Sequence, residues 1–171
     1  MNWGCYDLDY LLGLTGWQLK PRLVLARTWR VAPSYESYVA PDSDAETHVT
    51  ALVVCEGGTV INYERAEYAA ARAENMWQIT GTEGSLRLSM VPGKEPTAVF
   101  DCATPDRGTV SDDLGLDTPD PLAGMALQLD DVAHAIREHR LPQSGLEEAL
   151  LVQRITDAIY ESSLRGAAVE L

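Results

Sequence analysis

The chain has 171 residues, a hydrophobic fraction of 46%, a charged fraction of 23% and a formal net charge of −13. This size and composition are ordinary for a soluble globular protein with its own hydrophobic core, so we expect a single domain over residues 1–171. Only 13 Lys and Arg residues stand against 26 Asp and Glu residues. This balance argues against nucleic acid as a partner, because its phosphates attract basic side chains.

The three cysteines, Cys5, Cys55 and Cys102, are far apart and include no Cys-x-x-Cys pair. Their spacing favours free thiols over a disulfide framework, and we expect no metal site. No apolar run approaches the roughly 18 residues that span a bilayer, and no signal peptide is visible. We therefore expect a cytoplasmic protein without membrane contact.

The first predicted element is a short helix within residues 2–17. One apolar stripe is formed by residues three and four apart: Leu8, Leu11, Leu12 and Thr15. Asp7 and Asp9 fall in the first turn, where negative charge is favoured, and Gly16 can end the helix. A chain that opens on such a helix resembles a part of something longer.

Residues 19–31 predict a strand with one buried face. That face carries alternate apolar residues: Leu23, Leu25, Trp29 and Val31. We expect Trp29 in the core, and Arg27 falls in the same buried register. Residues 32–45 predict a loop in which Tyr35 and Tyr38 either cover a site or belong to an ordinary connector.

Two glycine-containing turns predict β-hairpins. Gly57 and Gly58 separate the predicted strands 47–55 and 59–69, and the second turn, within residues 75–88, has Gly81 and Gly84 at its ends. Residues 97–102 predict a further strand. Residues 101–121, rich in Asp, Pro, Gly and Thr, predict a loop with solvated acidic residues.

Two predicted helices close the chain. The first, over residues 125–139, has an apolar face of Leu129, Val132, Ala133 and Ile136. Ser144 and Glu147 form a predicted capping box that opens the second helix, and Gly166 ends it. Its expected buried side consists of Leu146, Leu150, Ile155, Ala158 and Ile159. Residues 167–171 are compatible with a last short strand.

Strands grouped together, rather than alternating with helices, predict an α+β fold. We expect a largely antiparallel open β-sheet with helices packed on one face and the other face free for oligomerisation. Because an uncovered sheet face with apolar residues tends to self-associate, we expect a homo-oligomer, a dimer or larger, built through that face.

Three sequence blocks resemble motifs of one known family. Residues 2–9 are similar to its Asp-x-Gly-x-His/Tyr-x-Ile-Asp helix, residues 79–86 match its Ile-x-Gly-Thr-x-Gly-x-Leu hairpin, and residues 159–169 resemble its closing Ile-Tyr-x-Ser-Ser-x-x-Gly-x-x-Val. Each block alone is a weak signal. In this order and over nearly the whole chain, they resemble the C-terminal domain of the Gfo/Idh/MocA (glucose–fructose oxidoreductase, inositol dehydrogenase) family.

The resemblance implies a substrate site. In that family the second domain supplies an Asp and a His or Tyr, and these positions correspond to Asn2 and Tyr6, our candidate catalytic residues. Asn2 does not ionise, so it can hydrogen-bond a substrate hydroxyl but cannot act as a base. The alternatives are that Tyr6 is a half-buried aromatic at the helix start and that Asn2 caps the first turn.

Three further residues on predicted strands are candidates for substrate binding: Tyr63, Arg65 and Trp77. They either reach a sugar or polyol pocket or lie at a subunit interface or on ordinary surface. The sequence has no Gly-x-Gly-x-x-Gly turn and no Glu-Lys-Pro motif. We therefore expect no cofactor to be bound by this chain alone, whereas the resemblance implies NAD(P) for the full-length enzyme.

Two functional hypotheses follow. In the first, the chain is the substrate-binding and oligomerisation domain of an NAD(P)-dependent sugar or polyol oxidoreductase, inactive in isolation and separated from a Rossmann domain. In the second, it is a stand-alone, non-catalytic oligomeric module that binds a carbohydrate-like ligand or a partner protein. Asn2 in place of the family's acid favours the second, so the sequence leaves open whether the chain is part of an enzyme.

Overall fold

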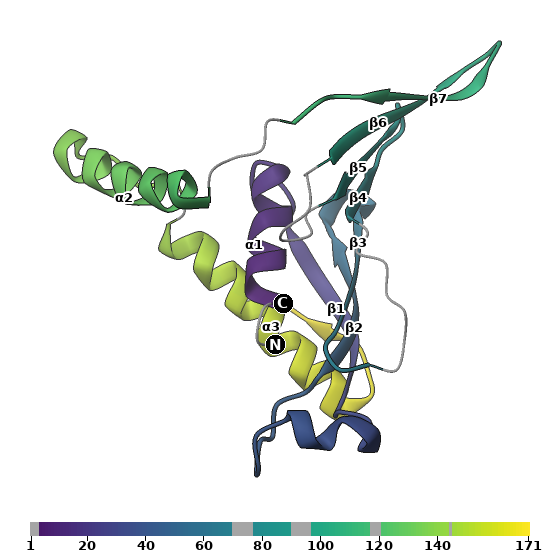
Figure 1. Cartoon of the computed structure of the whole chain (residues 1–171), viewed down its shortest axis with the longest axis vertical. Coiled ribbons are helices and arrows are strands. Elements are labelled where there is room, and N and C mark those ends of the chain that lie inside the picture. Colours follow the sequence, from purple (N-terminus) through teal and green to yellow (C-terminus); the bar gives the residue numbers. More distant parts are fainter. Residues whose placement is uncertain (1–3, 70–76, 90–96, 117–120, 144) are drawn as a thin grey trace. The chain divides into compact units, whose positions relative to one another are not determined.

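The computed structural model describes residues 4–69, 77–89, 97–116, 121–143 and 145–171. They fall into two compact units: unit 1 comprises Met1–Ala71 and Leu141–Leu171, and unit 2 comprises Arg72–Arg140. The described strands form two open, antiparallel four-stranded sheets, one in each unit (Figure 1). The predicted α+β class is confirmed, although the strands form two sheets where the sequence suggested one.

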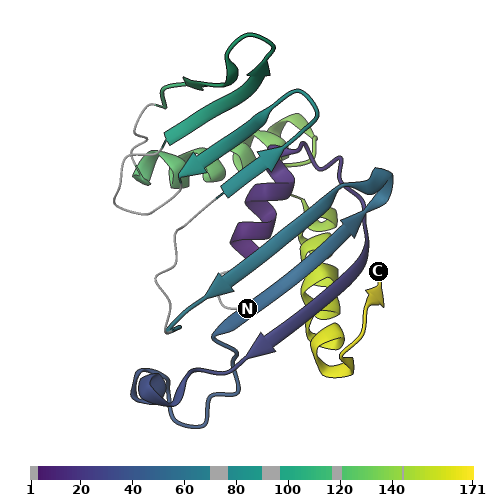
Figure 2. The same ribbon diagram turned by 90° about the vertical axis from the view of Figure 1, so that its right-hand side faces the viewer.

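Unit 1 is a sheet with helices on one face. Its strands, in the order β3-β2-β1-β8, are β1 (Pro21–Trp29), β2 (His48–Cys55), β3 (Val60–Ala66) and β8 (Val169–Glu170). The helices α1 (Gly4–Leu14) and α3 (Leu146–Arg165) pack against one face, and Figure 2 looks onto the other. Two short 3₁₀ helices, η1 (Pro33–Tyr38) and η2 (Glu56–Gly58), lie in the connections.

The core of unit 1 lies between these helices and the sheet. Leu8 and Leu12 of α1 and Ile155 and Ile159 of α3 are fully buried. Each such side chain contributes about 1.5–3 kcal/mol by leaving water. The predicted stripe along the first helix is therefore confirmed, with Leu8 and Leu12 fully buried and Leu11 and Thr15 half-buried, and Gly16, with φ of 63°, follows the helix as expected.

The predicted register of the first strand is wrong. Val24 and Ala26 face the core, whereas Leu25 and Trp29 lie on the opposite face with 48% and 44% of their surface exposed. Arg27 is exposed on that same open face. Because β1 has apolar residues on both faces, alternation alone does not tell which face the helices cover. The covered face takes the smaller side chains, and the ring of Trp29 instead lies 4.8 Å from that of His48.

Both predicted hairpins are confirmed. Gly57 and Gly58, with φ of 77° and 87°, connect β2 to β3. In unit 2, β4 (Trp77–Thr80) and β5 (Ser85–Ser89) are joined by a turn in which Gly81 N–H donates to the Gly84 carbonyl at 2.8 Å.

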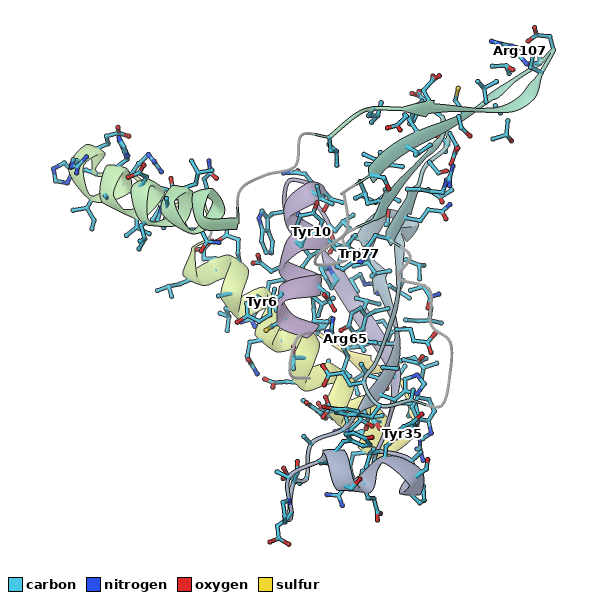
Figure 3. All side chains as sticks on the ribbon, in the orientation of Figure 1. Tyr6, Tyr10, Tyr35, Arg65, Trp77 and Arg107 are labelled. Atoms are coloured by element: carbon cyan, nitrogen blue, oxygen red, sulfur yellow. The ribbon has the colours of Figure 1, made fainter. Side chains whose placement is uncertain are left out.

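Unit 2 has the sheet order β4-β5-β6-β7, with β6 (Thr97–Thr104) and β7 (Gly108–Asp113), and the helix α2 (Pro121–Glu138). The loop predicted for residues 101–121 is wrong over its first half, because β6 continues to Thr104 and β7 pairs with it. Arg107 marks the tip of this hairpin in Figure 3. A polar strand with one neighbour needs no alternating apolar pattern, so β7 resembles a loop in sequence.

The two long helices differ from prediction in what they bury. Leu146 and Leu150 are 89% and 51% exposed, and burial along α3 becomes complete only from Val152 onward. The predicted apolar residues of α2 also stand in solvent: Leu129, Val132 and Ile136. In α3 the predicted face is buried at Ile155, Ala158 and Ile159, whereas in α2 the buried residue is Ala135, which the predicted face did not include.

The start of α3 is displaced by one residue from the prediction. Gly145 is the N-cap, and its N–H donates to the Glu148 carboxylate at 3.0 Å; the predicted box used Ser144 and Glu147. Ser144 lies outside the described residues. The other end is as predicted, because Gly166 has φ of 65° and β8 follows it.

Candidate functional site

The first turn of α1 is tied to the sheet by a partly buried polar cluster. Arg65 Nη1 of β3 donates to Asp7 Oδ2 at 2.6 Å, and the Tyr63 hydroxyl donates to the same oxygen at 3.3 Å. The side chain of Asp7 is 17% exposed and that of Arg65 is 33% exposed. Figure 3 shows Arg65 between α1 and the sheet.

Tyr63 and Arg65 are brought together because residues two apart on a strand share a face. Burial, together with the nearby Asp7 carboxylate, raises the pKa of Tyr63. Its hydroxyl therefore stays protonated and remains a hydrogen-bond donor at neutral pH.

Arg65 has donors beyond its bond to Asp7. Its Nη2 lies 3.7 Å from Glu67 Oε1, and its Nε is buried without a hydrogen-bond partner among the described residues. Buried donors are rarely left unpaired. The guanidinium group is therefore shared between two carboxylates and keeps one donor for a further acceptor.

Tyr6, the candidate catalytic residue, precedes Asp7 on α1 and is 64% exposed. The cluster thus holds the helical turn that carries Tyr6 against the sheet. The sequence analysis used Asp7 only for its place in the first helical turn and missed its contact with Arg65. The sequence signal that could have predicted this contact is the opposite charge of Asp7 in the first helical turn and Arg65 on a strand.

The remaining two candidates are not brought into this cluster by the described contacts. Trp77 is a half-buried residue of β4 in unit 2. Asn2 lies outside the described residues. Their roles therefore stay predictions.

A pocket of about 830 Å³ opens beside the cluster, entirely within unit 1. Its polar and aromatic walls are Tyr38, Asp44, Glu46, Glu67, Tyr68 and Tyr160. Glu67 belongs to both features, because it also faces Arg65. Tyr38, which the sequence left between cover and connector, is therefore a wall of this pocket.

The Ser-Ser pair of the third sequence block has a structural role. Ser162 is fully buried, accepts a hydrogen bond from Ala26 N at 2.8 Å and donates to the Ala167 carbonyl at 2.7 Å. Ser163 Oγ accepts from Thr28 N at 3.0 Å. β8 pairs with β1 only at Leu23 and Val24. The two serine hydroxyls therefore accept hydrogen bonds from the next backbone N–H groups along this edge of β1, those of Ala26 and Thr28.

The glycines of the second block are also structural. A Cβ on Gly84 would lie 2.5 Å from the Asp101 carbonyl oxygen and 2.8 Å from the Phe100 ring, so no side chain fits there. The nearest atom to a Cβ on Gly81 would be 3.6 Å away. Gly84 is therefore required by close packing of the hairpin on β6.

Within the described part of the chain, no cluster of three or more His, Cys, Asp or Glu residues has the arrangement of a metal site. Among the same residues, no helix combines the length and apolar character needed to cross a membrane.

The fold and the residues of the three blocks define a class of protein. The family model described as "Oxidoreductase family, C-terminal alpha/beta domain" (GFO_IDH_MocA_C) matches residues 1–171. The chain therefore belongs to the C-terminal domain of the Gfo/Idh/MocA oxidoreductase family.

Particular relatives are similar over part of their length. The D-xylose 1-dehydrogenase (NADP(+)) 2 of Haloferax volcanii is 28% identical over 131 residues, which are 76% of this chain and 38% of that protein. The aldose-aldose oxidoreductase of Caulobacter crescentus, solved with glycerol, has a TM-score of 0.75 at 21% identity and covers 98% of this chain and 46% of its own. An Agrobacterium radiobacter oxidoreductase, solved with NAD+, L-tartaric acid and magnesium, has a TM-score of 0.68 at 19% identity. The match covers 98% of this chain and 47% of that chain. The chain thus spans less than half the length of each.

Proposed function

We propose that this chain is the substrate-binding and oligomerisation half of an NAD(P)-dependent oxidoreductase that acts on a sugar or polyol. Membership of the family supports oxidoreductase chemistry. The names of the D-xylose and aldose relatives support a sugar substrate, and the NAD+ complex of another supports a nicotinamide cofactor. The single observation that carries the proposal is the Asp7–Arg65–Tyr63 cluster, which holds the helical turn bearing Tyr6 against the sheet.

Each residue has a proposed role. Tyr6 donates to, or accepts from, the substrate hydroxyl that loses its proton, and Asn2 hydrogen-bonds a neighbouring hydroxyl. Arg65 and Tyr63 position the helix and offer donors to substrate oxygens, and Trp77 offers an apolar surface to the sugar ring. The nicotinamide supplies hydride acceptance when it is bound. Since the sequence has no glycine-rich phosphate turn, we assign its binding to a Rossmann domain.

A fused protein tests the catalytic part. A nicotinamide-binding Rossmann domain from an oxidoreductase of this family is joined ahead of residue 1, and reduction of NADP+ and NAD+ is followed with aldoses and polyols. We expect turnover with at least one of them, and the fusion partner alone serves as the control. A folded fusion that binds the nucleotide but oxidises no sugar or polyol in the panel would contradict the proposal.

The second candidate function is the non-catalytic module, which the amide at Asn2 favours. The Asn2→Asp variant of the fusion separates the two. If the chain retains the family's chemistry, the Asn2→Asp fusion should oxidise the sugar with a kcat at least as high as that of the unmodified fusion. If sugar binds equally well to both proteins and neither turns over, the module is the correct description.

The proposed oligomer forms through the open face of the unit 1 sheet (Figure 2). Leu25 and Leu52 lie directly opposite each other on β1 and β2 and are 48% and 43% exposed. An arginine at the centre of such a face desolvates a charge on association, so Leu52→Arg should yield monomers in sedimentation. Leu164→Arg, at an exposed leucine of α3, is the matched control. A wild-type monomer at micromolar concentration would refute this part.

A further inference from the structure

The open face of the unit 1 sheet presents a regular grid of side chains on three strands. In this sheet β2 lies between β1 and β3, and Figure 2 looks onto the open face. The side chains that point away from the helices form rows across β1, β2 and β3: Leu23–Val54–Val60, Leu25–Leu52–Asn62, Arg27–Thr50–Glu64 and Trp29–His48–Ala66. In each row, the residues of β1 and β3 therefore flank β2 on opposite sides.

One row carries opposite charges on its two sides. Arg27 of β1 and Glu64 of β3 are both paired in register with Thr50 of β2. Within the described ranges Arg27 forms no salt bridge, and its Nη1 makes a long contact of 3.4 Å to the Ser163 carbonyl at an exposed position. Glu64 Oε1 lies 2.9 Å from His48 Nε2, and the Glu64 side chain is 64% exposed. Both charged groups can therefore take a further partner.

The face is formally neutral on a strongly acidic chain. Apart from His48, its rows carry one arginine and one glutamate, whereas the whole chain has a net charge of −13. Two copies of the chain repel each other over most of their surface. At the open face a second copy meets no net charge, and it meets the half-exposed apolar side chains of Leu25, Leu52 and Val60.

The charges distinguish two ways of placing a second copy on this face. In a symmetric face-to-face dimer, a twofold axis lies between the two sheets. If the axis runs along β2, β1 of one copy lies over β3 of the other, row by row, and Arg27 lies over Glu64 of the partner subunit. If the axis runs across the strands, each strand lies over itself. Arg27 then faces either its own copy or a leucine of β1, which leaves its charge repelled or unpaired.

Side-chain sizes favour the axis along β2 as well. In that arrangement the large ring of Trp29 lies over the methyl group of Ala66, and Leu52 meets its own copy at the axis. A large side chain opposite a small one fills the space between two sheets, whose mean planes are about 10 Å apart. Leu25 over Asn62 is the least favourable of the contacts.

We propose that the open face binds a second copy of this chain with the twofold axis along β2, so that Arg27 pairs with Glu64 of the partner subunit twice per dimer. The inference rests on the oligomer of the proposed function and adds its orientation. Complementary charges across an interface mainly fix register and exclude wrong arrangements. The two ion pairs therefore select this orientation, while the apolar rows supply the contact area.

Charge reversal tests the orientation. Arg27→Glu and Glu64→Arg should each raise the Kd of the dimer about tenfold or more, because like charges then face each other twice. An equal mixture of the two variants should form dimers again, since every facing pair in the mixed dimer has opposite signs. Sedimentation equilibrium gives the Kd, and thermal unfolding checks that each variant is folded. Failure of the mixture of folded variants to restore dimers would overturn the inference.

A matched pair on α3 controls for net charge. Arg154 and Glu161 are exposed on the helix that covers the other face of the sheet. Arg154→Glu and Glu161→Arg change the charge of the chain by the same amounts, and should leave the Kd of the dimer within about threefold of the wild type. If this pair behaves like Arg27→Glu and Glu64→Arg, the effect is one of net charge and the inference is refuted.

A size exchange tests the same arrangement without charge. Ala66→Trp should raise the Kd of the dimer about tenfold, because the ring of Trp29 of the partner subunit already fills this space. Adding Trp29→Ala to the same chain should recover the wild-type Kd. No recovery in a folded double variant would count against the axis along β2.

The outcomes separate this inference from the proposed function. If Leu52→Arg abolishes the dimer while the charge-reversed variants do not restore each other, the open face is the interface and only the orientation fails. A monomeric wild type refutes the proposed oligomer and this inference together. Neither result bears on the catalytic proposal, which the turnover of the fused protein decides.

Discussion

The two units are stabilised in different ways. Unit 1 contains the whole hydrophobic cluster found among the described residues, with Leu8, Leu12, Ile155 and Ile159 fully buried between helices and sheet. In unit 2, the described residues include only two buried apolar side chains, Ala98 and Ala135. Its sheet relies on backbone ladders and on a surface network of Arg87, Asp101 and Ser111. A residue in unit 1 is thus constrained by packing, and one in unit 2 mainly by local backbone geometry.

This difference should be visible in hydrogen exchange. Amides in β1 and β2, whose inner face is covered by helices, should exchange only through global unfolding. Amides in β6 and β7 should exchange through local opening at a lower free energy. Equal protection of the two sheets in mass-spectrometric exchange would contradict the comparison.

The largest expected mutational effect is in the core of unit 1. Ile159 is fully buried on α3, and Ile159→Ala should cost about 2–5 kcal/mol through lost transfer energy and a cavity. Leu146→Ala, at an 89% exposed position of the same helix, is the control and should change stability by less than about 0.5 kcal/mol. Denaturant unfolding of both variants provides the measurement, and similar losses would contradict the buried face described for α3.

The next effect concerns the buried hydroxyl of unit 1. In Ser162→Ala, Ala26 N loses its acceptor and the Ala167 carbonyl loses its donor. Leaving the buried Ala26 N–H unpaired should cost about 1–3 kcal/mol. Ser163→Ala, at a half-buried position where water can replace the hydroxyl, should cost less. The reverse order in thermal unfolding would show that the edge of β1 is satisfied in another way.

In unit 2, the close packing of the hairpin on β6 is tested by adding a single methyl group at Gly84. Gly84→Ala places a Cβ against the Asp101 carbonyl and the Phe100 ring, so we expect a loss of about 1–3 kcal/mol from overpacking. Gly81→Ala, in the same turn, meets nothing closer than 3.6 Å and should be nearly neutral. Exchange protection of β5 and β6 reports on the unit directly. Equal tolerance of both alanines would refute the close packing.

The surface network of unit 2 predicts a smaller, pH-dependent effect. Hydrogen bonds from Arg87 and Ser111 lower the pKa of Asp101 from 3.8 to about 2. A carboxyl with a lowered folded-state pKa stabilises the fold above pH 4, and this contribution is lost as the pH falls toward 2. In the Asp101→Asn variant, the stability of unit 2 should therefore fall less between pH 4 and pH 2 than in the wild type. An unchanged acid limb would contradict the network's role.

The smallest expected effect is that of salt. A net charge of −13 repels itself, and raising sodium chloride from about 0.1 M to about 1 M shortens the screening length from about 10 Å to about 3 Å. The melting temperature should therefore rise with salt. A fall over this range would show that attractive ion pairs, such as Arg65 with Asp7, outweigh the repulsion.

Much of the fold could be predicted because its signals are local. Gly57 with Gly58 predicted a hairpin, Gly16 and Gly166 predicted helix ends, and all of these are found. The register of β1 could not be predicted, because Leu25 and Val24 are both apolar and only α3 decides which one is covered. The strand β7 could not be predicted either, because its pairing with β6 leaves no apolar pattern.

The candidate site divides in the same way. Tyr63 and Arg65 were predicted only to lie on a strand, whose two-residue repeat puts them on one face, and both contact Asp7. Their partner Asp7 is 58 residues from Arg65, and the pocket wall Tyr160 is 114 residues from Glu46. Such contacts depend on how α1 and α3 meet the sheet, which no short pattern contains.

The central proposal is that α1 presents Tyr6 to a sugar in an enzyme completed by a nicotinamide-binding domain. Its most direct test is the kcat of the fused protein, comparing Tyr6→Phe with Tyr35→Phe, which removes the same hydroxyl from η1. We predict a fall in kcat of about 10²-fold or more for Tyr6→Phe, as expected for loss of a positioned proton-transfer group, and none for Tyr35→Phe. Equal kcat values for Tyr6→Phe and the unmodified fusion would contradict the account.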